Sequence, residues 1–360
     1  LATALPASVR GTRSADVLAA VMAAAASSSE RGAPSEPTTT STIRICSYNI
    51  GLRGLPALCT TPLDTLGPAD VHGIQRRMGF GSLAELLRQC DADVICFQEV
   101  KMAELSSLER AVALAEGYDS FFALCRKQNP STSYGRYAGV ATFVRTAFRP
   151  HRAEEGVTGV LSPNSASNDA AGSSFASMLA SFPGAAAEPT DSAIDSEGRC
   201  VITIHGDLAI LNVYVPANSS DDPARQEERL AFKAAFLRAL ERRARSLLAE
   251  GLRVLIIGDF NIAPNRIDSA RELQAQQPSG ATRSRVWLDE LLHPRNNANG
   301  GPPRTPFADC FRMLHPTARE AYTCFHVAAG ADAFNFGSRI DLALLAPPPI
   351  VSGTAEDAAS

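Results

Sequence analysis

Short apolar segments with the length of buried β-strands are spread through the sequence from residue 43 to residue 345. Runs of four to eight apolar residues bounded by turn residues are typical of strands that a sheet buries. We predict strands at residues 43–49, 93–98, 120–125, 138–144, 200–205, 209–215, 254–258 and 340–345. Gly206 and Asp207 lie between two of these strands, so they predict a tight turn and an antiparallel hairpin.

Helical segments are interleaved with these strands. Residues 223–250 show the strongest pattern, with apolar side chains on one stripe, Pro223 at the first position and Gly251 to end the helix. Ser82 and Glu85 have the spacing of a capping box, which predicts a helix over residues 82–90. Two more helices are expected at residues 105–115 and 287–292, while Gly and Pro make residues 51–80 a predicted loop. Hairpins mixed with helices favour an α/β fold in which two mixed β-sheets pack face to face with helices outside.

Composition divides the chain into one domain and its flanking segments. Residues 43–346 are the predicted domain, and residues 161–194, rich in Ser, Ala, Asn, Gly and Pro, are a predicted disordered insertion. Residues 1–40 are expected to be a disordered low-complexity tail, although their Ala, Ser, Thr and Arg content also resembles a transit peptide. Residues 347–360 are expected to be a second tail.

Charge and cysteine content exclude several classes of protein. The net charge of −4 gives no general attraction to nucleic acid, so DNA binding would need a local basic surface or a metal ion. The eight cysteines include no CxxC pair, which argues against a zinc ribbon, and several lie in apolar runs, as expected in a reducing compartment. No apolar run reaches the roughly 20 residues that span a membrane.

Polar side chains recur at the ends of the most apolar strands, where α/β folds bind ligands. They are Asn49, Gln98, Glu99, Asn212, Tyr214, Asp259, Asn261 and Asp341. Carboxylate and amide oxygens suit Mg²⁺ or Mn²⁺, and Asn or Tyr donors can stabilise the charge that develops on a phosphate. Each residue alone also has an ordinary explanation as a turn, cap or core residue. The combination favours metal-dependent phosphodiester cleavage.

Six segments together resemble one known superfamily. They are SYNIGLR (47–53), DVICFQEVK (93–101), YAGVATF (137–143), NVYVPAN (212–218), IIGDFNIAP (256–264) and SRIDLALL (338–345). In this order they resemble the endonuclease/exonuclease/phosphatase superfamily, whose fold is a four-layer α/β sandwich. YAGVATF, SEGR (196–199) and the segment 307–325 resemble the class II abasic-site endonucleases of the exonuclease III type. DSEGR (195–199) and FNFGSRID (334–341) are similar to the second eukaryotic paralogue of that branch.

The resemblance implies a role for each matching residue. Glu99 would ligate Mg²⁺ or Mn²⁺, and Asn49 would lie in or next to the coordination shell. Asp259 would orient or deprotonate the attacking water, Asn261 would hold the phosphate and Tyr214 would donate to it. The family residue that matches Asp341 orients a catalytic histidine. Further substrate contacts are expected from Asn212, Asn218 and Arg339.

The function that this resemblance implies is base-excision repair of DNA. The expected reaction is hydrolysis of the phosphodiester 5′ to an abasic site, with 3′–5′ exonuclease and 3′-phosphodiesterase activity. The expected partner is duplex DNA with abasic sites or 3′ ends, the expected state a monomer, and the expected location the nucleus, with a mitochondrion or other organelle as the alternative. Another phosphodiesterase or phosphatase of the superfamily is the first alternative function.

The sequence departs from the family pattern at three places. The family ends on a strand that carries Ser-Asp-His, but none of the six histidines here follows Ser-Asp. We expect truncation of this final strand; its true loss would instead favour a catalytically impaired DNA-binding relative. The family has one more residue, Asp or Asn, between the positions of Ile50 and Gly51, and this residue is missing here. Ala217 stands where the family has a polar residue, so Asn218 would have to take over the role of that residue.

Overall fold

The structure is a computed structural model of the 360-residue chain. It describes residues 42–348 except for residues 52–53, 66–78, 103–112, 127–136, 162–188, 218–222, 271–272, 274–278, 296–303, 326–330 and 332–334. Within this described part, no helix is both long and apolar enough to cross a membrane.

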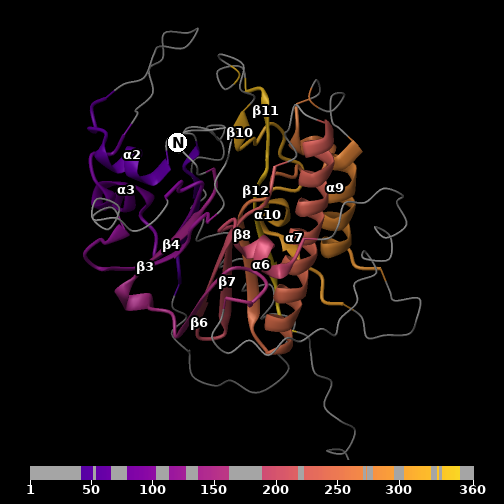
Figure 1. Ribbon diagram of the computed structural model, residues 1–360, viewed down its shortest axis with the longest axis horizontal. Coiled ribbons are helices and arrows are strands. Elements are labelled where there is room, and N and C mark those ends of the chain that lie inside the picture. The colour runs from indigo at the N-terminus through magenta and orange to yellow at the C-terminus, as the bar shows by residue number, and fades with distance from the viewer. Residues whose placement is uncertain are drawn as a thin grey trace, which may run out of the picture.

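Two mixed sheets form the centre of the molecule (Figure 1). The smaller sheet has the order β1 (Ile45–Asn49), β2 (Val94–Gln98), β4 (Val140–Arg145) and β3 (Tyr118–Ala123). The larger has the order β5 (Arg152–Glu155), β6 (Cys200–His205), β7 (Leu208–Tyr214), β8 (Arg253–Asp259), β12 (Asp341–Ala346) and β9 (Ala308–Asp309). Only the pairs β1–β2 and β7–β8 are parallel, while the other neighbours within these two sheets are antiparallel. The strands β10 (Cys324–Phe325) and β11 (Gly337–Ser338) form a separate antiparallel pair.

Helices cover the outer face of each sheet, so the domain has four layers (Figure 1). The smaller sheet is covered by α2 (Gly54–Thr60) and α3 (Leu83–Cys90), and the larger by α7 (Pro223–Ala249) and α9 (Ser279–Leu292). Two short helices are α6 (Asp191–Asp195) and α10 (Cys310–Leu314), and single 3₁₀ turns occur at Thr146–Phe148 and Arg266–Asp268. The predicted α/β fold with two mixed sheets is therefore confirmed.

Alternation along the central strands explains why four layers form. In β2, Val94 and Cys96 face the larger sheet, whereas Ile95 and Phe97 pack with the helices α2 and α3. The larger sheet follows the same rule, since even-numbered side chains of β7 such as Ile210 face inward and odd-numbered ones contact α7. A strand places successive side chains on opposite faces, so a strand that is apolar on both faces needs a covering layer on each side.

The predicted hairpin is present, and the capping of α3 is as expected. The strands β6 and β7 pair directly through residues His205 and Leu208, and Gly206 has the positive φ of +60° that a tight turn requires. The Ser82 hydroxyl accepts a hydrogen bond from the Glu85 backbone N–H at the start of α3. Such an N-cap satisfies one of the free amides at a helix start.

Some predicted boundaries differ from the structure. The predicted loop over residues 51–80 is wrong at α2, because Leu55, Leu58 and Cys59 give this segment an apolar face that the smaller sheet buries. Pro56 lies in the first turn of α2, where proline is tolerated. The helix α9 begins eight residues before the predicted helix at Trp287, and α6 overlaps the end of the predicted insertion. Residues 103–112 and 162–188, which hold most of one predicted helix and of that insertion, lie outside the described residues.

Candidate active site at the strand ends

The topology brings six of the predicted site residues to one edge of the two sheets. The parallel pairs β1–β2 and β7–β8 end at this edge, which places Asn49, Glu99, Tyr214, Asp259 and Asn261 there. Because β12 runs antiparallel to β8, its first residue Asp341 pairs with Asp259, the last residue of β8. The strand order of the fold thus gathers residues that are up to 292 positions apart in the sequence.

Asn49 connects the two sheets at this edge. Its Nδ2 donates to Glu99 Oε1 at 3.1 Å and to Asp259 Oδ2 at 2.8 Å. Its Oδ1 accepts from the Gly51 backbone N–H at 2.8 Å, which fixes the orientation of the amide. A single side chain therefore holds a carboxylate from each sheet within hydrogen-bonding distance of the same nitrogen.

Glu99 is presented by a backbone turn with a left-handed conformation. Its φ is +56°, and that of Lys101 is +50°. Val100 between them is fully buried, and its N–H donates to the Gly139 carbonyl at 3.0 Å. The Lys101 ammonium lies 2.8 Å from Glu99 Oε2. Buried packing and backbone hydrogen bonds hold the two charged side chains next to each other at the edge of the site.

Asp259 is buried, with 4% of its surface exposed. Its Oδ1 accepts from the Asn261 backbone N–H at 2.8 Å. Burial raises the pKa of Asp259 to about 8, and the neighbouring Asp341 carboxylate acts in the same direction, while the Asn261 and Asn49 hydrogen bonds oppose the shift. A carboxyl group with such a pKa can accept a proton near neutral pH, as a general base must.

Asn261 has a left-handed backbone, with φ +49°. Its Nδ2 donates to the Val215 carbonyl at 2.9 Å, and its own carbonyl accepts from Lys233 Nζ at 2.9 Å. The residue is partly exposed beside Asp259. A pocket of about 170 Å³ opens next to it, lined also by Ile262, Ala263, Ser284, Arg285, Ser338 and Ile340.

Tyr214 is the last residue of β7 and lies over a buried ion-pair network. The Arg199 guanidinium stacks 4.7 Å from the Tyr214 ring centroid and donates to the Tyr214 carbonyl at 3.0 Å. Glu197 is fully buried and binds both Arg199 and Arg229, at 2.6 Å and 2.7 Å. Burial and the nearby Glu99 carboxylate raise the pKa of Tyr214, so its hydroxyl stays a hydrogen-bond donor.

Asp341 has an unsatisfied atom. Its Oδ1 is buried and has no hydrogen-bond partner among the described residues, although the residue as a whole is partly exposed. Burial raises the pKa of Asp341 to about 6, with the Thr323 hydrogen bond opposing the shift. Buried carboxylate oxygens are nearly always paired, so this atom indicates room for one further donor.

Asn212 does not reach the surface of the site, contrary to its predicted substrate contact. It is completely buried and bridges the sheets, with Oδ1 accepting from Gln98 Nε2 at 2.8 Å. Its Nδ2 donates to the Ala141 carbonyl at 2.9 Å. Residue 212 lies two positions before Tyr214 and so shares its face of β7, but it lies farther from the strand end and is covered completely by the smaller sheet.

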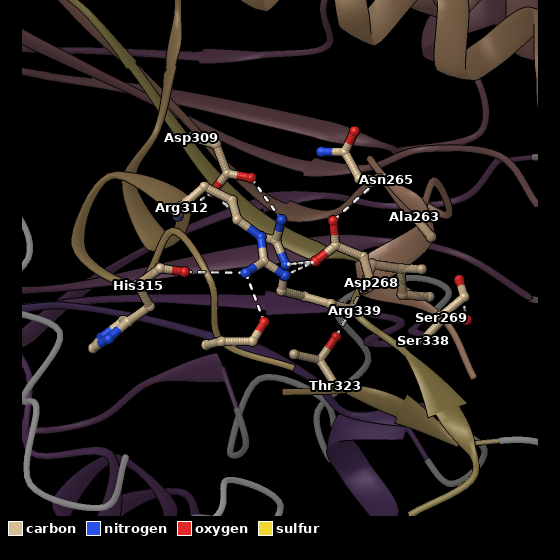
Figure 2. A network of polar contacts seen from close by, with 12 residues as sticks. Ala263, Asn265, Asp268, Ser269, Asp309, Arg312, His315, Thr323, Ser338 and Arg339 are labelled. Carbon is tan, nitrogen blue, oxygen red and sulfur yellow. Dashed lines mark hydrogen bonds and ion pairs between the residues drawn. The ribbon is translucent and has the colours of Figure 1, made fainter. Parts of the chain in front are cut away.

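Arg339 is also buried, with 2% of its surface exposed. Figure 2 shows its guanidinium between two carboxylates, and the distances are 2.7 Å to Asp268 Oδ1 and 2.6 Å to Asp309 Oδ2. Arg312 also binds Asp268 and donates to the His315 carbonyl at 3.0 Å. The predicted substrate contact is corrected to a structural role, because these acids occupy the guanidinium. Asn218 lies outside the described residues.

The donors at this edge are of a kind that can hold a divalent metal ion. Among the described residues, no three His, Cys, Asp or Glu side chains are grouped as ligands. A site for an ion such as Mg²⁺ does not require such a group, because this ion keeps several waters and binds one or two carboxylates together with substrate phosphate. Glu99 supplies a hard carboxylate oxygen of this kind, and the Asn49 Nδ2 donates to that carboxylate at 3.1 Å.

Three charged residues beside the site had no role in the sequence-based prediction. Lys101 and Arg199 lie within quoted motifs, so their position in the sequence was a signal, but their contacts were not foreseeable. Lys233 lies on the apolar stripe of α7, three residues from both Leu230 and Phe236. A lone lysine on a buried stripe was the signal for it.

Comparisons with known proteins agree with this geometry. A profile of the Endonuclease/Exonuclease/phosphatase family matches residues 46–357. The chain is 35% identical over 277 residues to the Mus musculus protein named DNA-(apurinic or apyrimidinic site) endonuclease 2, which covers 73% of this chain and 48% of that protein. The same-named protein of Schizosaccharomyces pombe is 32% identical over 289 residues, covering 77% and 51%.

A solved structure supports the fold. The catalytic domain of Xenopus laevis APE2 superposes with a TM-score of 0.54 and 32% identity, covering 73% of this chain and 77% of that one. The chain spans about half the length of the curated relatives named above. The resemblance inferred from the motifs is confirmed: this chain belongs to the Endonuclease/Exonuclease/phosphatase family.

Proposed function

We propose that this chain hydrolyses the DNA phosphodiester 5′ to an abasic site in a reaction that depends on a divalent metal ion. The observation that carries the proposal is the link from Asn49 to both Glu99 and Asp259 at the edge of the two sheets. A metal-binding carboxylate and a buried base within reach of one amide are the parts that hydrolysis of a phosphodiester needs. The printed names of the AP endonuclease 2 relatives support DNA as the substrate.

Each residue of the site has a separate role in the proposed reaction. Glu99 would hold Mg²⁺ or Mn²⁺, with Asn49 next to the ion, and the bound ion would neutralise phosphate charge. Asp259 orients the attacking water and accepts its proton, since burial gives it a pKa of about 8. Asn261 and Tyr214 donate to the phosphate oxygens as charge builds on them. The products are a 3′-hydroxyl and a 5′-deoxyribose phosphate.

The wider setting is DNA repair on duplex substrates. The proposal includes 3′–5′ exonuclease and 3′-phosphodiesterase activity, action as a monomer and location in the nucleus. A Streptococcus pneumoniae protein named exodeoxyribonuclease, 27% identical over 286 residues, supports the exonuclease component. Because a negatively charged chain has no general attraction to DNA, binding depends on the site and its metal ion.

A second candidate is a catalytically impaired DNA-binding relative. The Asp341 Oδ1 atom favours it, because this atom is buried and has no hydrogen-bond partner among the described residues, as expected if the site is not fully assembled. Under this alternative the chain would bind the duplex and leave it intact.

A substrate panel separates the proposals. The chain would be incubated with Mg²⁺ and a duplex carrying one tetrahydrofuran abasic analogue, a 3′-recessed duplex, polyadenylated RNA or a phosphoinositide. Incision of the abasic duplex, with trimming of the recessed end, is the expected result. Release of adenosine monophosphate from RNA, or of phosphate from the lipid, with intact DNA would assign the chain to another activity of the family. Duplex binding without cleavage of any substrate would favour the impaired relative.

A further inference from the structure

Lys233 is a buried cation directly behind the proposed catalytic residues. It lies on α7, only 1% of its surface is exposed, and it is among the largest fully buried side chains of the described residues. Its helix neighbours Phe232, Phe236 and Leu237 belong to the core between α7 and the larger sheet. The lysine therefore extends through an apolar layer to reach the strand ends.

The ammonium makes one hydrogen bond, and the acceptor belongs to the site. Nζ donates to the Asn261 backbone carbonyl at 2.9 Å, which is its single hydrogen-bond acceptor among the described residues. Burial lowers the pKa of Lys233 to about 7, while attraction to the Asp259 carboxylate acts in the opposite direction. The side chain thus points toward the turn that joins Asp259 to Asn261.

Stability alone does not explain a lysine at this position. Removing an ammonium from water is unfavourable, and replacing buried charges with apolar side chains of similar size is often neutral or stabilising. Met or Leu would continue the apolar stripe of α7 at no such cost. Residues that lower stability in this way are common at functional sites.

The turn that Lys233 contacts has a strained conformation. Asn261 has φ +49°, a left-handed conformation that non-glycine residues seldom adopt. Three hydrogen bonds fix it: its N–H binds Asp259 Oδ1, its Nδ2 binds the Val215 carbonyl, and its carbonyl binds Lys233. Removal of Lys233 would leave this carbonyl facing an apolar layer without a donor, so the turn would rearrange to satisfy it elsewhere.

We propose that Lys233 is a positioning residue, whose ammonium holds the Asn261 carbonyl and so keeps the Asn261 side chain and the Asp259 carboxylate aimed at the scissile phosphate. The proposal rests on the proposed function for its effect on catalysis. Its effect on the turn is independent of that function. Lys233 touches no reacting atom, so its contribution is to geometry, where a displacement of about 1 Å can cost about 100-fold in rate.

The test compares Lys233→Met with Arg242→Met, both on α7. Arg242 has an exposed side chain, so its substitution removes a positive charge from the same helix away from the site. For Lys233→Met, kcat on the abasic duplex should fall at least about tenfold with KM unchanged, as expected when geometry rather than substrate binding is lost. The melting temperature should be no lower than in the unmodified chain. Arg242→Met should leave kcat, KM and the melting temperature unchanged.

Amide hydrogen exchange supplies the structural readout. With ¹⁵N-asparagine labelling, the Asn261 backbone N–H should exchange at least about tenfold faster in Lys233→Met, while Asn212 keeps its protection. Lys233→Gln, which still offers an N–H donor, should recover part of both kcat and the protection of Asn261.

The results for Lys233→Met either support or overturn the positioning role of Lys233. Unchanged kcat, unchanged exchange at Asn261, or loss of folding in Lys233→Met would each overturn the positioning role, the last because Lys233 would then be a structural residue. If the unmodified chain cuts no substrate, the proposed function fails, and faster exchange at Asn261 would still support the contact to the turn.

Discussion

Three side chains of the candidate site come from residues whose backbone is left-handed. Glu99, Lys101 and Asn261 are half of the six non-glycine residues with positive φ in the described part of the chain. Such conformations cost roughly 1–3 kcal/mol each and persist only where neighbouring contacts enforce them. Their concentration at one edge of the sheets indicates that the backbone there is less stable than it could be, because it holds these three side chains in particular directions.

Asp259 should make stability depend on pH. Its pKa rises from about 4 in an unfolded chain to about 8 in the fold. Between these values the folded state binds more protons, so this group lowers the free energy of unfolding progressively as pH rises from about 4 to about 8. Asp259→Asn removes the effect, so its stability relative to the unmodified chain should grow over this range.

The measurement is urea denaturation of both proteins in EDTA at several pH values. Asp259→Asn should also lose cleavage activity, because an amide cannot accept the proton of water. A stability difference that stays constant from pH 5 to pH 8 would show that Asp259 titrates normally.

Strand ends could be predicted from the sequence, but the direction of each side chain could not. Asn49, Glu99, Tyr214, Asp259, Asn261 and Asp341 do converge, because each follows or begins a strongly apolar strand. Asn212 and Arg339 are near the same strands but are buried in polar networks. Which face a residue occupies depends on the pleat and on partners distant in sequence, such as Gln98 and Asp309.

At the level of elements, the packing of β7 against β8 sets the distance between Tyr214 and Asp259, which are paired residues. Gly258 has φ +140°, and a Cβ at this position would lie 2.1 Å from the Val213 carbonyl oxygen. Only glycine allows the two parallel strands to approach this closely. The Gly of the IIGDFN segment therefore determines how the site is assembled.

Gly258→Ala should lower the free energy of unfolding by about 2–6 kcal/mol, combining backbone strain of about 1–3 with overpacking of about 1–3. Gly206→Ala is the control, since Gly206 also has positive φ but open space around it. Gly206→Ala should lower the free energy of unfolding only by the cost of a left-handed backbone at a non-glycine residue, about 1–2 kcal/mol. Equal losses in the two variants, measured by urea denaturation, would exclude a special role for the close approach.

The network in Figure 2 connects three elements near the start of β12. Arg339 binds Asp268 in a 3₁₀ turn and Asp309 at the start of α10, and its backbone N–H also donates to the Asp268 carbonyl. Because Asp341 lies two residues further on, the network anchors the segment that carries it. Sequence patterns did not predict this, since no periodicity marks a partner 71 residues away.

Arg339→Ala should cost about 3–5 kcal/mol of stability, because it leaves the buried Asp309 carboxylate without its ion-pair partner and Asp268 with Arg312 alone. The exposed Arg88, paired with Glu85, provides the comparison, and Arg88→Ala should change stability far less, because solvent screens this ion pair. Chemical denaturation measures both. If Arg339→Ala kept full stability and weakened DNA binding, the original prediction of a substrate contact would be restored.

At the scale of the whole molecule, the order of strands and helices was sufficient to predict two mixed sheets with outer helices. The predicted strands all occur within a few residues, because each is an uninterrupted apolar run. The helix α2 was missed because Gly54 and Pro56 were interpreted as breakers, whereas burial of its apolar face outweighs their low propensity. Tertiary packing, which local patterns do not contain, decides such cases.

The Asp341 oxygen that lacks a partner in the described part of the chain gives a prediction for the whole chain of 360 residues. Free imidazole should stimulate cleavage of the abasic duplex severalfold, because it is small enough to enter beside this oxygen and supply a hydrogen-bond donor. Asp341→Asn should abolish this stimulation, so the cleavage rate of this variant should be the same with and without imidazole. Identical rates with and without imidazole would show that Asp341 needs no such partner.

The most direct measurement is incision of a duplex with one tetrahydrofuran abasic analogue, by the unmodified chain, Glu99→Gln and Asp259→Asn, with Mg²⁺ and with EDTA. We predict cleavage 5′ to the lesion in Mg²⁺ alone, and a loss of at least about 100-fold in each variant, as for other groups that stabilise the transition state directly. Cleavage that persists in EDTA, or that survives loss of either carboxylate, would contradict the assignment of these strand ends as the active site.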